Sequence, residues 1–123
     1  MIEVTDEEFS ALIADSLERL PREHRTAIKN VAIVYADDPT PEQRERLKLA
    51  CNQTLFGLYE GVSLPQRLGV TSYGPDKITI FKGPITRSVD SLGALRKEIY
   101  HTLWHEVAHY FGLNHDRIHE LEQ

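Results

Sequence analysis

Three histidines and a glutamate near the C-terminal end of the chain are spaced so that they can act together on one metal ion. The run from His105 to His115 reads HExxHxxGxxH, in which x is any residue. On an α-helix, positions four apart lie one above the other, so His105 and His109 can bind one zinc ion together. Gly112 favours a left-handed turn that ends the helix and brings His115 back as a third ligand. The pattern therefore predicts one Zn²⁺ per chain with an open fourth coordination position.

Glu106 follows the first of these histidines by one residue. It lies about 100° further round the helix, so it is not expected to coordinate the metal but can reach a water held on it. Zinc lowers the pKa of its bound water and polarises a carbonyl group, and a nearby carboxylate can take the proton and pass it to the leaving amine. We therefore expect a zinc metallopeptidase, a hydrolase in which Glu106 is the general base.

The composition is that of a single globular domain over residues 1–123, with 41% hydrophobic and 27% charged residues. Cys51 is the only cysteine, which excludes an intrachain disulfide and a cysteine-rich zinc site. The net charge of -5 argues against nucleic-acid binding. No apolar run is long enough to span a membrane and the N-terminus is acidic, so we expect a cytoplasmic protein without a membrane partner. The oligomeric state is left open.

The apolar periodicity predicts helices and strands in the order α, β, α, β, β, α. Thr5 and Glu8 form a capping box at the start of the first helix, which Pro21 stops. The expected elements are helices over 5–20, 41–56 and 91–111, strands over 31–35, 69–72 and 77–81, and a loop over 57–67. The last helix carries an apolar stripe and the HExxH run, so its metal end should be buried on several sides.

Several polar residues remain open between two roles. His101 lies one turn before the first metal ligand and either contacts substrate or is an exposed histidine beside Glu98. Any of four tyrosines could donate a hydrogen bond to a tetrahedral intermediate or could be purely structural, namely Tyr59, Tyr73, Tyr100 and Tyr110.

The metal motif resembles those of the zincin metallopeptidases, and more of the chain is similar to a family of small bacterial zincin-like proteins, the mini-zincins. The resembling segments are VAIV from Val31, GLYEGVSLPQR from Gly57, PDKITIFKGPI from Pro75, the HExxHxxG helix and Asp116 to Leu121. The resemblance implies a minimal zincin-like α+β fold, in which a small twisted sheet of about three strands packs on the active-site helix and two further helices. It also implies a peptide or protein substrate that adds to the edge of strand 77–81, with the loop 58–67 as the opposite wall.

The chain departs from this family at the third ligand position, where the family usually has Asp and this chain has His115. Met1 is the only methionine, so the Met-turn of metzincins is absent. Asp116 either hydrogen-bonds a ligand histidine or caps the next helix, and Glu120 is an alternative third ligand of the gluzincin kind. Two other functions stay open: a degenerate zincin that binds zinc and a peptide or protein without catalysis, and a hydrolase of a non-peptide amide or ester.

Overall fold

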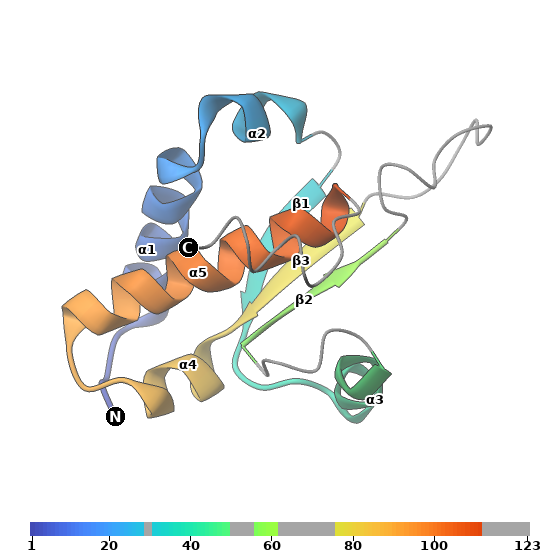
Figure 1. Cartoon of the computed structure of the whole chain (residues 1–123). Helices are drawn as coiled ribbons and strands as arrows, with labels where there is room; N and C mark the ends of the chain where they lie inside the picture. The colour runs from blue at the N-terminus through green and yellow to red at the C-terminus, as the bar shows by residue number, and fades with distance from the viewer. Residues whose placement is uncertain (29–30, 50–55, 62–75, 112–123) are drawn as a thin grey trace.

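The architecture comes from a computed structural model that describes residues 1–28, 31–49, 56–61 and 76–111. Within these ranges the elements are α1 (Asp6–Arg19), α2 (Arg22–Ala27), β1 (Val31–Ala36), α3 (Pro41–Leu49), β2 (Gly57–Glu60), β3 (Asp76–Phe81), α4 (Lys82–Ser88) and α5 (Leu92–Tyr110). Figure 1 shows α5 lying across the small sheet, with α1 beside it. The predicted α+β class is confirmed, although the short helices α2 and α4 were not predicted.

The sheet is open and mixed, with the strand order β1-β3-β2. Strand β1 runs parallel to β3, whereas β2 pairs with β3 in the antiparallel direction. The side chains of Ile78, Ile80 and Phe81 in β3 are fully buried, as expected for a central strand covered on both faces. The prediction that strand 77–81 offers an edge is therefore wrong, because β3 has a neighbour on each side. Among the described residues the edge strands are β1 and β2, and β2 lies in a segment predicted as a loop.

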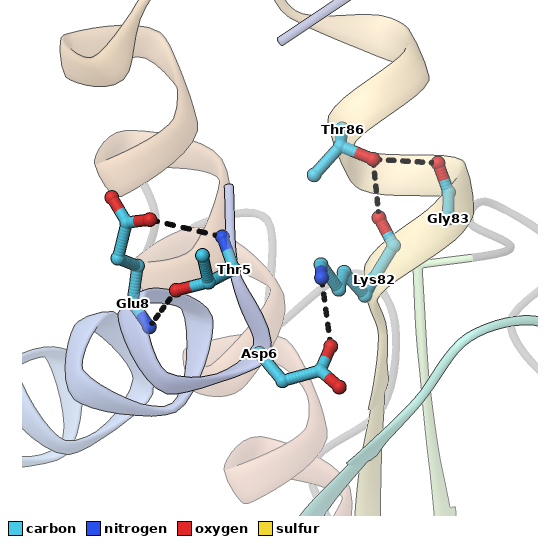
Figure 2. Close-up of polar contacts among 6 residues, drawn as sticks. All are labelled: Thr5, Asp6, Glu8, Lys82, Gly83 and Thr86. Atoms are coloured by element: carbon cyan, nitrogen blue, oxygen red, sulfur yellow. Dashed lines mark hydrogen bonds and ion pairs between the residues drawn. The ribbon is translucent and has the colours of Figure 1, made fainter. Parts of the chain in front are cut away.

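Helix α1 begins at the predicted capping box (Figure 2). The hydroxyl of Thr5 accepts a hydrogen bond from the backbone N–H of Glu8, and the Glu8 carboxylate accepts one from the N–H of Thr5, both at 3.0 Å. Such a cap stabilises a helix by about 1 kcal/mol. Lys82 of α4 pairs with Asp6 at 2.7 Å, and the Thr86 hydroxyl donates hydrogen bonds to the carbonyls of Lys82 and Gly83 within α4 (Figure 2). The start of α1 is thereby joined to α4.

Helix α5 has nearly the predicted bounds. Ser91 is its N-cap and accepts a hydrogen bond from the N–H of Ala94 at 3.1 Å, and Phe111 is its C-cap. Leu92 is 51% exposed, so the predicted apolar stripe begins one turn later than expected. The rest of the stripe is buried against the sheet and α1, with Phe9, Ile78, Ile80, Leu95, Ile99, Leu103 and Val107 in one core cluster.

The remaining boundaries differ more. Helix α3 was predicted to reach Phe56, but Phe56 itself forms a bend before β2, and residues 50–55 lie outside the described ranges. The predicted strand 69–72 also lies outside them. No helix in the described part of the chain is both long and apolar enough to cross a membrane.

Candidate metal centre

The C-terminal half of α5 presents the two histidines of the HExxH run on one side of the helix. The ring centroids of His105 and His109 lie 5.0 Å apart, with the ring planes at 44°. His105 is only 5% exposed and its Nε2 atom is buried, while His109 is partly buried. The two imidazoles are therefore close enough to face one common ligand.

Glu106 is buried and contacts both His109 and strand β2. Its side chain is 3% exposed, and one carboxylate oxygen lies 3.9 Å from Nδ1 of His109. Burial raises the pKa of Glu106 to about 8, and a hydrogen bond from the backbone of Tyr59 opposes this rise. Burial therefore favours the protonated form of this carboxyl group in the metal-free protein.

Gly57 lets β2 approach the helix closely enough to reach Glu106. A Cβ atom at this position would lie 2.7 Å from Cγ2 of Thr102 and 3.3 Å from Cγ of Glu106. Both of these atoms belong to α5, so any side chain at residue 57 would push the strand and the helix apart. Glycine is thus needed here for close approach.

The hydrogen-bond phase of the β2–β3 ladder decides which backbone groups of β2 face outward. The N–H of Phe81 donates to the carbonyl of Phe56 at 2.7 Å, so this pair is a hydrogen-bonded one. In an antiparallel ladder such pairs alternate, which leaves the backbone groups of Gly57 and Tyr59 pointing away from β3. The outward N–H of Tyr59 is the one bonded to Glu106.

A second acid lies near the end of α5. Asp76 is the first residue of β3 and is 1% exposed, and the hydroxyl of Tyr59 donates a hydrogen bond to its Oδ2 at 2.5 Å. The ring of Tyr59 also packs edge-on against Tyr110 of α5, with centroids 6.1 Å apart.

The other predicted site residues are not brought together within the described ranges. His115, Asp116 and Glu120 all lie in residues 112–123, outside these ranges. His101 is exposed on α5, which agrees with its interpretation as a surface histidine. Among the residues that the structure describes, no group of three or more His, Cys, Asp or Glu could hold a metal ion. Of the three predicted ligands, His105 and His109 thus lie within the described ranges and His115 does not.

Gly57 and Asp76 were missed as parts of the site. Asp76 follows Gly and Pro in the sequence, and the strand was predicted to begin at residue 77, although it begins at Asp76. The four residues of β2 lie between Phe56 and Gly61, and their pairing with β3 is the feature that separates them from a loop.

Comparison with known proteins identifies a protein family for the chain. Residues 28–123 match a family model described as zincin-like metallopeptidase. Among solved structures, a conserved hypothetical protein from T. thermophilus is similar in fold, with a TM-score of 0.54 and 18% sequence identity. The match covers 88% of this chain and 94% of that one. No curated protein matches the sequence.

Proposed function

Because this chain belongs to the family of zincin-like metallopeptidases, we propose that it hydrolyses peptide bonds with the help of one zinc ion. The proposed ligands are His105, His109 and His115, and the proposed general base is Glu106. The observation that carries the proposal is the position of the Glu106 carboxylate. It is buried, lies 3.9 Å from the imidazole of His109 and accepts a hydrogen bond from the backbone of Tyr59 in β2.

The residues present fit a zinc ion. Two imidazoles one helical turn apart, 5.0 Å between ring centroids, offer nitrogen donors of the kind that zinc prefers. The burial of His105 shields one of these donors from bulk water, which favours a tightly held ion. His115 supplies a third nitrogen in the spacing HExxHxxGxxH.

Zinc, when bound, supplies a Lewis acid that activates water and polarises the scissile carbonyl group. Glu106 then acts as a proton carrier: its carboxylate accepts a proton from the attacking water and passes it to the leaving amine. The burial of Glu106 keeps bulk water away from this transfer. The N–H of Tyr59 holds the carboxylate in place.

Strand β2 offers the edge for the substrate. The outward backbone groups of Gly57 can pair with an extended peptide laid beside the strand, while the outward N–H of Tyr59 is bonded to Glu106. A short glycine-containing edge above the base would bring the scissile bond near Glu106. In this proposal β2 takes the place of strand 77–81 as the substrate-binding edge, because that strand pairs with β1 on one side and with β2 on the other.

The test is a peptide-library assay on the zinc-loaded protein and on Glu106→Gln. We expect the wild-type protein to cleave, and the glutamine variant to retain zinc but lose at least ~100-fold in kcat, because the amide cannot accept the proton. Glu98→Gln is the matched control, since Glu98 lies on the same helix two turns earlier and should keep wild-type activity. A zinc-loaded wild-type protein that cleaves no peptide would instead support the binding function without catalysis.

A further inference from the structure

We propose that Asp76 and Tyr59 form a positioning pair that holds strand β2, and through it the carboxylate of Glu106, in place for catalysis. This inference rests on the proposed peptidase function. It assigns a role to a buried carboxylate that takes no part in the proton transfer itself.

The first step is the bond between the two side chains. Tyr59 stands opposite Ile78 in the ladder, and Asp76 lies two residues before Ile78 on the same face of β3. The tyrosine side chain therefore reaches diagonally across the strand pair, as long side chains can. Its hydroxyl donates to Asp76 at 2.5 Å, in surroundings where Asp76 is 1% exposed. A bond of this kind to a buried carboxylate is stronger than one between neutral groups when the carboxylate is ionised.

The second step is that the chain after β2 folds closely over the same carboxylate. Gly61 has a φ of 153°, a conformation that side chains rarely adopt. A Cβ atom at Gly61 would overlap the carboxylate of Asp76, so only glycine fits. Asp76 is thus contacted from two positions of one short segment: Tyr59 within β2 donates a hydrogen bond to it, and the backbone at Gly61 lies close against it.

The third step leads from Tyr59 to the general base. The backbone N–H of Tyr59 points away from β3 and bonds Glu106, while the side chain of the same residue bonds Asp76. A shift of Tyr59 would therefore move the donor that orients the Glu106 carboxylate. Because β2 has only four residues, few ladder bonds resist such a shift.

The same geometry decides one of the open roles of the tyrosines. A tyrosine hydroxyl has a single proton to donate, and that of Tyr59 is donated to Asp76. Tyr59 is therefore a positioning residue rather than a donor to the tetrahedral intermediate.

The test uses Tyr59→Phe in the full-length zinc-loaded protein, with Tyr35→Phe on β1 as the matched control. Tyr35 is 37% exposed and lies on the far strand, so its hydroxyl is not part of the pair. In Tyr59→Phe we expect the backbone amide of residue 59 to exchange with solvent ~10-fold faster, while those of Ile78 and Ile80 change less than ~3-fold. We also expect kcat to fall ~10-fold with KM within ~3-fold and zinc content unchanged.

A second pair of variants tests the carboxylate. Asp76→Asn keeps an oxygen that can accept the tyrosine hydrogen and should retain most of the kcat, whereas Asp76→Ala should resemble Tyr59→Phe. The proposal is overturned if the amide of residue 59 in Tyr59→Phe exchanges at the wild-type rate, or speeds up equally with Ile78 and Ile80. A wild-type kcat in Tyr59→Phe overturns it as well. If the wild-type protein cleaves no peptide, the proposed function fails, and the amide exchange alone decides on the pair.

Discussion

Glu106 meets two opposing requirements. Its burial next to β2 places it over the predicted metal ligands, but the same burial raises its pKa to about 8, and a protonated carboxyl cannot act as a base. A divalent cation held by His105 and His109 favours the ionised form, because opposite charge nearby lowers the pKa of an acid. The metal-free and zinc-loaded proteins are therefore expected to differ in the charge of this one side chain.

The stability of the metal-free protein should therefore depend on Glu106. The ordinary pKa of the group, 4.5, is raised to about 8 in the folded state, so between these values the folded state binds more protons than the unfolded state. The free energy of unfolding therefore falls as the pH rises from 4.5 to about 8. We expect Glu106→Gln to become more stable than the wild type by ~2–4 kcal/mol between pH 5 and pH 9, measured by urea unfolding with chelator present. Glu98→Gln is the control and should follow the wild type. If the free energy of unfolding of Glu106→Gln had the same pH dependence as that of the wild type, this prediction would be contradicted.

At the same scale, part of the site could be predicted from the sequence and part could not. The proximity of His105, Glu106 and His109 could be predicted because their spacing acts within one helix, whose geometry is known in advance. Asp76 could not, since its importance comes from the hydroxyl of Tyr59 on another strand. The role of Gly57 likewise depends on how closely β2 approaches α5. Contacts of this kind exist only after the elements have packed.

At the scale of elements, the long helices were predictable and the short strand was not. Helix α1 has a capping box at its start and Pro21 after its end, and α5 has Ser91 as its cap, so local signals give their bounds. Strand β2 has four residues, fewer than the usual ~5–6, which is too short for an alternation to be recognised. Its identity as a strand comes from pairing with β3.

The contact between β2 and α5 can be tested with Gly57→Ala. The added methyl group meets Thr102 and Glu106, so we expect a loss of ~1–3 kcal/mol in stability and a ~10-fold fall in kcat as the base is displaced. Gly93→Ala is the matched control, because nothing lies within 4 Å of a Cβ atom there and alanine favours the helix. Thermal unfolding and peptide cleavage measure both effects. Equal behaviour of the two variants would show that close approach at residue 57 does not matter.

At the scale of the whole molecule, the proposed metal ion would be bound by residues of helix α5 and by a residue of the segment that follows it. The helix α5 provides two imidazoles from a core shared with the sheet and α1, while the third predicted ligand follows the end of that helix. The sheet provides the edge β2 and, through Asp76, its anchor. A ligand that binds only the folded state stabilises it by mass action, so zinc should raise the stability of the entire domain.

We therefore expect excess zinc to raise the Tm of the chelator-treated protein on the order of 10 °C, from ~4 kcal/mol at a thousandfold excess over Kd. The HExxHxxGxxH spacing predicts that His115→Ala loses most of this rise, whereas Asp116→Asn keeps it with zinc affinity lowered at most ~10–100-fold. His101→Ala is the control, because this exposed histidine on the same helix is not a predicted ligand. Differential scanning calorimetry and metal titration give both quantities. If Asp116→Asn or Glu120→Gln lost the zinc response more completely than His115→Ala, the third ligand would be that carboxylate, and the chain would close its metal site from a different point of the segment after α5.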